Sequence, residues 1–213
     1  MFWFTADLHL GAPYTFDRRR PFDSQETCDK TILKNLKSCV SKEDRFIVVG
    51  DLFNCTHSDT ESWESTGARV RRTGLHIQLI MGNNEDRILR EKFDGNMAEF
   101  QKYCAQFNID VIGYSCVIKL NKLPLYVTHD PDACNSSHLN IYGHVHEAGQ
   151  ISALGFNVGQ DVNGYFPVSE RELCRRIYNV AKYFDKSVKA STNIKDISLW
   201  RKYYHDTKQF VGE

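Results

Sequence analysis

Seven short runs of apolar residues predict β-strands. They cover residues 2–6, 45–50, 76–82, 115–120, 123–128, 139–143 and 156–159. The early runs are almost continuously apolar, as strands covered on both faces of a sheet are. Amphipathic segments separate several of these runs, so the pattern predicts an α/β domain.

Four segments carry the start signal of a helix, which is a capping side chain followed by Glu three residues later. These pairs are Asp23 with Glu26, Ser58 with Glu61, Asn96 with Glu99, and Ser169 with Glu172. Apolar residues recur at helical spacing after three of them: Cys28, Ile32, Leu36 and Cys39; Met97, Phe100, Cys104 and Phe107; Leu173, Ile177, Val180, Ala181 and Phe184. Core packing is the ordinary use of such stripes.

Residues 186–213 lack the periodic spacing of apolar residues that marks the predicted strands and helices. They carry six Lys or Arg and three acidic residues, with Trp200, Tyr203, Tyr204 and Phe210 between them. We therefore predict one domain over residues 1–185. The remaining residues, 186–213, are predicted to form a C-terminal tail that is mobile or docked on a partner.

Composition narrows the class of protein. The chain has 213 residues, of which 41% are hydrophobic and 25% charged, as in ordinary globular domains. It has no basic leader and no apolar run near the roughly 20 residues of a membrane span, so we expect neither a signal peptide nor a membrane anchor. Seven scattered cysteines without a CxxC pair favour reduced thiols in a cytoplasmic protein.

The net charge is zero, with 27 basic and 27 acidic residues. A protein that coats long nucleic acids is therefore disfavoured, although a local basic patch remains compatible with this balance.

Five of the predicted strands are followed directly by side chains that can bind a metal. In chain order these are Asp7 and His9, Asp51, Asn83, His129, and His144 with His146. Each signal alone is ordinary turn or polar chemistry. Ligands gather at strand ends in open α/β sheets, and the joint order of all five makes coincidence a poor explanation.

This ligand set has a chemical meaning. Histidine, aspartate and asparagine together suit intermediate divalent cations, and the absence of cysteine argues against a closed structural zinc site. Seven ligands are too many for one ion with open positions, but they suit two ions that share a carboxylate. Two ions roughly 3.5–4 Å apart can hold a bridging hydroxide and stabilise an in-line phosphoryl displacement. The set therefore predicts phosphoester hydrolysis.

Five motifs in this order resemble the calcineurin-like metallophosphoesterase superfamily: ADLHLG, VVGDLFN, MGNNE, VTHDP and YGHVH. More narrowly, the chain resembles small single-domain bacterial and phage phosphoesterases, which share RRPFDS at 19–24 and a phrase like FNVGQDVNGYFPVS at 156–169. The resemblance implies a four-layer αββα sandwich of two mixed β-sheets flanked by helices.

The resemblance also assigns the ligands. Asp7, His9 and His146 would hold the first ion, Asn83, His129 and His144 the second, and Asp51 would bridge them. His144 and His146 would thus bind different ions. Mn²⁺ is the expected metal, with Fe²⁺, Zn²⁺, Ni²⁺ or Mg²⁺ as alternatives.

One departure from the family concerns catalysis. Relatives commonly read GNH where this chain has Asn84, which is predicted to donate a hydrogen bond to the phosphoryl oxygen but has no proton for a leaving group. Either the substrate has a good leaving group or another acid acts. His57, six residues after Asp51, is the candidate for that acid and is predicted to contact the substrate. Arg18, Arg19 and Arg20 are either part of a solvated loop or a phosphate contact, since guanidinium bonds two oxygens at once. If one of them binds the substrate phosphate, Arg20 is the predicted residue, because it belongs to the RPF match.

The leading hypothesis is a phosphodiesterase of small or nucleotide-like substrates that works by attack of a metal-bridging hydroxide. A phosphomonoesterase is the nearest variant. The alternative is a non-catalytic scaffold on the same fold, as in the retromer subunit that resembles these enzymes. A repair-type nuclease would normally need added domains or a wide basic surface. We expect a small phosphoester substrate, no stable complex with long nucleic acids, and a homodimer as one arrangement.

Overall fold

The computed structural model describes residues 1–12, 20–54, 60–120, 122–183 and 198–208, without the side chains of residues 60–63, 199 and 205. The predicted His57, Arg18, Arg19 and Ser58 lie outside the described residues.

The first β-sheet has the order β10-β1-β2-β3-β4. Four parallel strands form most of it: β1 (Phe2–Thr5), β2 (Arg45–Val49), β3 (Ile77–Ile80) and β4 (Ile109–Gly113). The short β10 (Val168–Ser169) pairs antiparallel with β1. The sheet is therefore mixed, and its parallel strands all end at the same edge.

The second β-sheet has the order β5-β6-β7-β9-β8. Its strands are β5 (Ser115–Leu120), β6 (Leu123–Thr128), β7 (Leu139–Tyr142), β8 (Ile151–Ser152) and β9 (Gly155–Asn157). The three central strands are parallel, and both outer strands pair antiparallel to their neighbours. The predicted α/β sandwich of two mixed sheets flanked by helices is confirmed.

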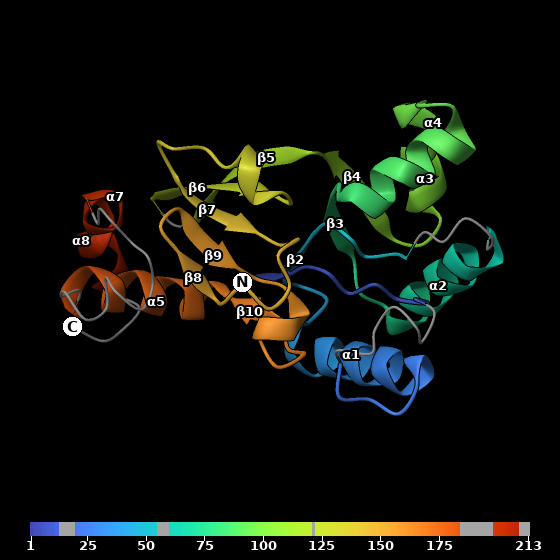
Figure 1. Cartoon of the computed structure of the whole chain (residues 1–213), viewed down its shortest axis with the longest axis horizontal. Coiled ribbons are helices and arrows are strands. Elements are labelled where there is room, and N and C mark those ends of the chain that lie inside the picture. Colours follow the sequence, from blue (N-terminus) through green and yellow to red (C-terminus); the bar gives the residue numbers. More distant parts are fainter. Residues whose placement is uncertain (13–19, 55–59, 121, 184–197, 209–213) are drawn as a thin grey trace.

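Helices lie on both sides of the sheets (Figure 1). The first four are α1 (Gln25–Cys39), α2 (Thr60–Thr73), α3 (Asn83–Phe93) and α4 (Met97–Ala105), and they lie beside the first sheet. The last three of the described helices are α5 (Glu170–Tyr183), α7 (Ser198–Lys202) and α8 (Tyr204–Thr207), and they lie at the opposite end. Two short 3₁₀ helices, η1 (Pro131–Ala133) and η2 (Gln160–Val162), follow strands β6 and β9.

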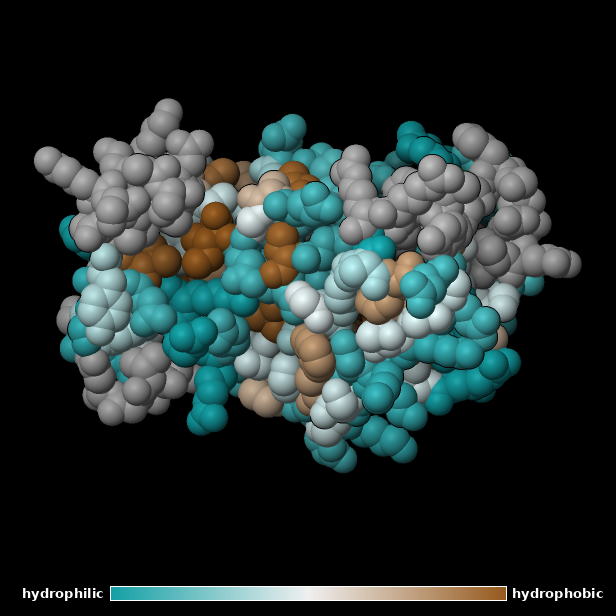
Figure 2. Space-filling view, turned by 60° about the horizontal axis from the view of Figure 1, so that its bottom comes forward, coloured by the Kyte–Doolittle hydropathy of each residue, from teal (hydrophilic) through white to brown (hydrophobic). Residues whose placement is uncertain are grey.

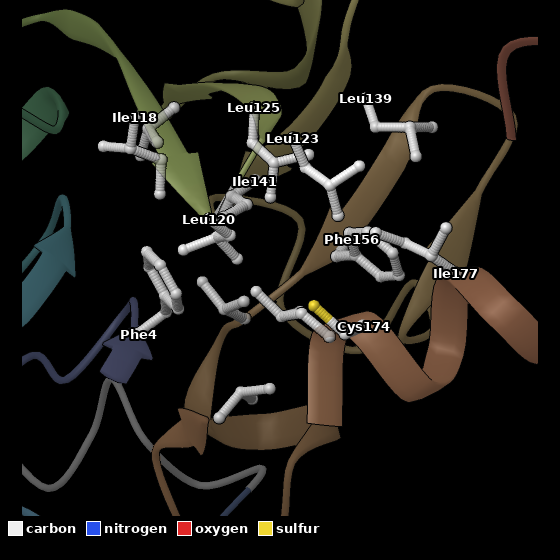
Figure 3. Packing of buried hydrophobic residues seen from close by; sticks show 14 of the residues in the cluster. Phe4, Ile118, Leu120, Leu123, Leu125, Leu139, Ile141, Phe156, Cys174 and Ile177 are labelled. Carbon is white, nitrogen blue, oxygen red and sulfur yellow. The ribbon is translucent and has the colours of Figure 1, made fainter. Parts of the chain in front are cut away.

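Strand β2 shows why the early strands are apolar on both faces. Ile47 and Val49 belong to the core between the sheets, whereas Phe46 and Val48 belong to the core under helices α1–α4. Full burial of such a side chain contributes roughly 1.5–3 kcal/mol. Figure 3 shows the core between the sheets, where α5 turns Cys174 and Ile177 toward Phe156.

The seven predicted strands are confirmed to within a few residues at their ends. Two predicted helix caps are also confirmed: Asn96 Oδ1 accepts the Glu99 N–H at 3.3 Å, and Ser169 Oγ accepts the Glu172 N–H at 3.1 Å. The cap predicted at Asp23 is wrong by one residue. Ser24 Oγ accepts the Thr27 N–H at 3.2 Å instead, because its extended backbone directly precedes the first helical residue.

The sequence patterns predicted neither helices α3, α7 and α8 nor strands β4, β8 and β10. Helix α3 is mostly charged and buries few apolar side chains, including Ile88 and Leu89, so its stripe is narrow. Strand β4 alternates buried Ile109 and Val111 with exposed residues over only five positions. The two remaining strands have two residues each, which is too short for any period to show.

The described part of the predicted tail packs on the domain's own core. The Trp200 ring contacts Phe156 at a centroid distance of 5.0 Å, and its Nε1–H donates to the Ala153 carbonyl at 3.4 Å. The Tyr203 hydroxyl donates to the Pro124 carbonyl at 3.3 Å. Both side chains are buried and therefore cannot present an aromatic surface to a partner.

None of the described helices is both long enough and apolar enough to cross a lipid bilayer. On the face shown in Figure 2, hydrophobic residues are scattered among hydrophilic ones. No disulfide joins the described cysteines.

Candidate metal centre

The predicted ligands come from the ends of strands in both sheets. Asp7 and His9 follow β1, Asp51 follows β2, Asn83 is the first residue of α3 after β3, His129 follows β6, and His144 and His146 follow β7. The two sheets meet at these ends, where Ala6 pairs with Gly159 just beyond β9. Residues more than 130 positions apart therefore share one site.

The first ligand group consists of Asp7, His9 and His146, whose ligand atoms lie within 4.8 Å of one another. The imidazole rings of His9 and His146 stack with centroids 5.1 Å apart and an angle of 12°. Asp7 and His9 are buried, whereas His146 is partly exposed.

The second group consists of Asn83, His129 and His144. The Asn83 Oδ1 lies 3.2 Å from His129 Nε2 and 3.1 Å from His144 Nδ1, and the two histidine atoms are 3.3 Å apart. Because Asn83 and His144 are exposed, this group is the more open side of the centre.

Asp51 lies between the two groups. Its Oδ2 is 3.8 Å from His9 Nε2, and its Oδ1 is 3.6 Å from His129 Nε2. Asp51 also forms a ligand cluster with Asp7 and His129 within 4.8 Å. One buried carboxylate thus presents an oxygen to each group, which is the arrangement that a shared ligand needs.

His144 and His146 fall in different groups although they are two residues apart. Their backbones have φ of 70° and 39°, so the segment is a turn and not an extended strand. The rule that alternate residues of a strand share one side does not apply to such a segment. His144 turns to His129, and His146 turns to His9.

Left-handed backbone recurs through the centre. Asp7, His9 and Asp51 have φ of 56°, 48° and 51°, in addition to the two turn histidines. Each such non-glycine residue costs on the order of 1–3 kcal/mol, and strain of this kind is retained mostly at functional sites. The left-handed backbone at the end of each strand turns these side chains toward the shared site.

Glycines leave room for the ligands. A Cβ on Gly143 would lie 2.5 Å from the Ala6 Cβ and 2.9 Å from the Asp7 Oδ2, and a Cβ on Gly82 would lie 2.3 Å from the Asp51 Oδ1. The glycine before the asparagines in GNN and the glycine before the histidines in GHVH are therefore steric requirements of neighbouring ligands.

The electrostatics of the centre suit cations. Burial raises the pKa of Asp7 and of Asp51 to about 6, and it lowers the pKa of His9 well below its usual value. Backbone N–H groups partly offset the cost of burying the ionised carboxylates: the N–H of His144 donates to Asp7, and the N–H of Asn84 donates to Asp51, both at 3.0 Å. Buried carboxylates whose ionisation is made costly by desolvation are stabilised when a cation binds. The donor set therefore fits divalent metal ions.

Glu85 supports the centre although the sequence analysis gave it no role. Its buried carboxylate accepts the N–H groups of Asp51, Phe53 and Gly82 at 2.8, 3.1 and 3.0 Å. Burial and the nearby Asp51 raise the pKa of Glu85 to about 7. The available signal was its position in MGNNE, directly after the ligand asparagine and Asn84.

Asp161 is the second supporting residue that the sequence analysis did not single out. Its Oδ2 lies 2.8 Å from His146 Nδ1, and Arg20 Nε donates to its Oδ1 at 2.8 Å. Burial opposes ionisation of Asp161, but the bonds from His146 and Arg20 hold its pKa at about 2. Its position in the GQD phrase was the available signal.

The structure places two of the predicted catalytic and substrate residues. Asn84 is buried beside the first group, with its Nδ2 3.4 Å from His9 Nδ1. The side chain of Arg20 is only 2% exposed and lies behind the ligands, where it bonds Asp161 and main-chain carbonyls. Contact of either residue with a substrate stays a prediction.

A cavity of about 210 Å³ opens beside the second group. It is lined by Met81, Gly82, Asn83, Asp86, Tyr114, Thr128, His129, Asp130, Ala133 and His144. The Tyr114 hydroxyl donates to Asp86 Oδ1 at 2.5 Å, which orients its half-exposed ring at this cavity.

Solved structures similar to this chain include three small proteins. A protein of unknown function from Aquifex aeolicus, AQ665, is 20% identical, with 83% of this chain and 98% of that chain covered and a TM-score of 0.53. The nuclease MPE of Pseudomonas putida is 20% identical, with coverage of 68% and 60% and a TM-score of 0.44. The phosphoesterase YfcE of E. coli is 14% identical, with coverage of 79% and 81% and a TM-score of 0.43.

The comparison with curated proteins gave no match. Among protein families, residues 1–174 match the calcineurin-like phosphoesterases. The candidate site of Asp7, His9, Asp51, His129 and His146 is consistent with a dinuclear metal centre. With most of its length matched to the family, this chain belongs to the calcineurin-like phosphoesterases.

Proposed function

We propose that this protein is a metal-dependent phosphodiesterase that hydrolyses a small or nucleotide-like ester. The observation that carries the proposal is Asp51, whose two carboxylate oxygens face two separate groups of ligands. Asp7, His9 and His146 would hold one ion, and Asn83, His129 and His144 the other. When bound, two divalent ions activate water and neutralise charge on the phosphoryl oxygens.

The cavity beside the second group supports a small organic ester as substrate. Met81 and the Tyr114 ring offer an apolar wall next to the exposed ligands Asn83 and His144. Asp86 and Asp130 at the same cavity disfavour additional phosphate groups, because like charges repel. A substrate with one phosphodiester and an uncharged organic group fits these surroundings.

Asn84 supports a preference for esters with good leaving groups. Its amide lies at the first ligand group, where it can donate a hydrogen bond to a phosphoryl oxygen. An amide supplies no proton to a departing alkoxide. We propose direct displacement without a covalent enzyme intermediate and Mn²⁺ as the preferred metal, because the mixed imidazole and carboxylate set suits it.

Hydrolysis assays with Mn²⁺ test the proposal. Wild-type protein should cleave bis-p-nitrophenyl phosphate faster than p-nitrophenyl phosphate. Asp51→Asn should lose at least about 100-fold in rate, by analogy with the loss of one electrostatic stabiliser. Asp110→Asn is the matched control, because Asp110 is an exposed aspartate on β4 whose carboxylate lies 2.9 Å from His76 Nε2.

Equal rates for wild type and Asp51→Asn would refute the enzymatic proposal and favour a scaffold. Faster cleavage of the monoester would overturn the diester preference while leaving the metal centre intact.

A further inference from the structure

A buried ion pair lies directly behind the first ligand group. Arg20 Nε and Nη2 donate to the two carboxylate oxygens of Asp161 at 2.8 and 3.2 Å. The side chains are 2% and 9% exposed. This two-pronged geometry fixes the plane of the Asp161 carboxylate more firmly than a single bond could.

Asp161 also holds a ligand. Its Oδ2 lies 2.8 Å from Nδ1 of His146, which therefore carries a proton and donates it. A neutral histidine with its proton on Nδ1 has an unprotonated Nε2, and only an unprotonated nitrogen can bind a metal ion. The carboxylate thus selects both the tautomer and the ring orientation of His146.

Arg20 reaches the first motif as well. Its Nη1 donates to the Leu8 carbonyl at 2.9 Å, and its Nη2 donates to the Asp7 carbonyl at 2.5 Å. These carbonyls belong to the left-handed turn that presents Asp7 and His9. One guanidinium therefore connects the turn that carries two ligands with the carboxylate that orients the third.

The backbone fixes Asp161 at this place. The preceding Gln160 N–H donates to the Ala6 carbonyl at 3.1 Å, and its side chain bonds Thr5. The segment after β9 is thus attached to the end of β1, one residue before Asp7. Asp161 and Arg20 come from opposite ends of the domain and meet only because of this attachment.

We propose that Arg20 and Asp161 are positioning residues for the first metal site, in which Asp161 orients His146 and Arg20 holds Asp161 together with the turn between Asp7 and His9. This inference rests on the proposed two-metal function. It replaces direct phosphate binding as the main role of Arg20. It also assigns a role to the RPF and GQD phrases, which contain no metal ligand.

Two variants test the pair. Asp161→Asn keeps the shape but loses the charge and one of the two acceptor oxygens. Arg20→Lys keeps a positive charge but cannot contact the carboxylate and both carbonyls at once. Glu172→Gln is the matched control, because Glu172 accepts from Arg175 and Arg176 on helix α5 and contacts no ligand.

The first measurement is Mn²⁺ binding by titration calorimetry and by electron paramagnetic resonance. Asp161→Asn should weaken one of the two sites by about 10–100-fold, the usual effect of losing a partner of a ligand histidine. The other site should keep its affinity within about threefold, and the control should match wild type at both sites. Unchanged binding in both variants, or equal weakening of both sites with a lower melting temperature, would overturn the proposal in favour of a structural pair.

The second measurement needs no metal. Nitrogen-15 NMR of the histidine rings should show His146 protonated at Nδ1 in wild type and in Glu172→Gln. In Asp161→Asn the Nε2–H tautomer should become populated. An unchanged tautomer would overturn the proposal.

The two measurements also separate this inference from the proposed function. If wild-type protein binds no Mn²⁺ and hydrolyses no ester, the proposed function is wrong, whereas the tautomer of His146 still decides whether Asp161 orients it. If Asp161→Asn does not fold, Arg20→Lys provides the same comparison at the other member of the pair.

Discussion

The backbone N–H of His144 donates to both carboxylate oxygens of Asp7 at 3.0 Å, although the two residues are 137 positions apart. This bond joins the end of β7 in one sheet to the end of β1 in the other. It orients the Asp7 carboxylate through protein groups alone. The first and last ligand motifs are therefore placed by the fold before any metal binds.

The buried carboxylates predict how pH affects the metal-free protein. The pKa values of Asp7 and Asp51 are raised to about 6, so their favourable contribution to folding is complete below the ordinary aspartate pKa and is lost as pH rises through about 6. Without metal, the melting temperature should fall by on the order of 5 °C between pH 5 and pH 7. Differential scanning calorimetry in the presence of a chelator measures this change.

Saturating Mn²⁺ should remove that fall, because a bound cation stabilises the charged carboxylates. At 100 times the dissociation constant the gain is about 2.7 kcal/mol. In the absence of metal, the melting temperature of Asp51→Asn should fall less between pH 5 and pH 7 than that of wild type. A melting temperature that rises from pH 5 to pH 7 without metal would contradict this account.

Alanine substitutions should show that the histidines of GHVH serve different ions. His144→Ala and His146→Ala should each bind about one Mn²⁺ tightly, by metal analysis after gel filtration. When Asn83→Ala is added to the His144→Ala variant, the amount of bound Mn²⁺ should change little, because both residues belong to the second group. When Asn83→Ala is added to the His146→Ala variant, tight Mn²⁺ binding should be lost, because the second site is the one that His146→Ala leaves intact. Identical losses in the two double variants would show that the histidines share one ion.

Asn84→His should supply the missing proton donor. We expect a gain on the order of 10²-fold for diesters with poor alkyl leaving groups and little gain for bis-p-nitrophenyl phosphate, whose leaving group needs no proton. The slope of log kcat against leaving-group pKa should become shallower. Asn84→Ala is the control, since it removes the amide without adding an acid. A uniform change across all esters would argue that residue 84 affects binding alone.

Gly143→Ala should destabilise the protein by about 1–3 kcal/mol, because the added Cβ would overlap the Ala6 Cβ and the Asp7 carboxylate. Urea unfolding measures the change. The double variant Ala6→Gly with Gly143→Ala removes the first overlap but not the second. It should recover stability in part while Mn²⁺ binding stays impaired. Full recovery of both stability and Mn²⁺ binding would show that the Asp7 carboxylate tolerates the added Cβ.

Trp200→Ala should lower the free energy of unfolding by about 3–5 kcal/mol, because the side chain is fully buried against Phe156. Tyr183→Ala is the control, since that ring is 60% exposed. The urea midpoints of the two variants provide the comparison. An unchanged midpoint in Trp200→Ala would show that residues 198–208 lie outside the cooperative fold.

The sequence by itself determined the local elements and the ligand types. Apolar runs of the right length predicted seven strands, and capping pairs predicted two helix starts, because these signals depend on neighbouring residues alone. The ligand motifs were also local, since each lies directly after a strand. Helix α3 was missed because its few buried apolar side chains leave a weak period.

The family resemblance implied that the ligands divide between two ions, but only the tertiary structure shows the physical reason for the division and the residues that support the ligands. His144 and His146 separate because left-handed backbone turns them toward different neighbours, and spacing in the chain does not reveal such a turn. The partnership of Arg20 with Asp161 spans 141 positions and depends on the attachment of the segment after β9 to the end of β1. Contacts of this range arise from sheet pairing and burial, so residue patterns could name the participants but not their partners.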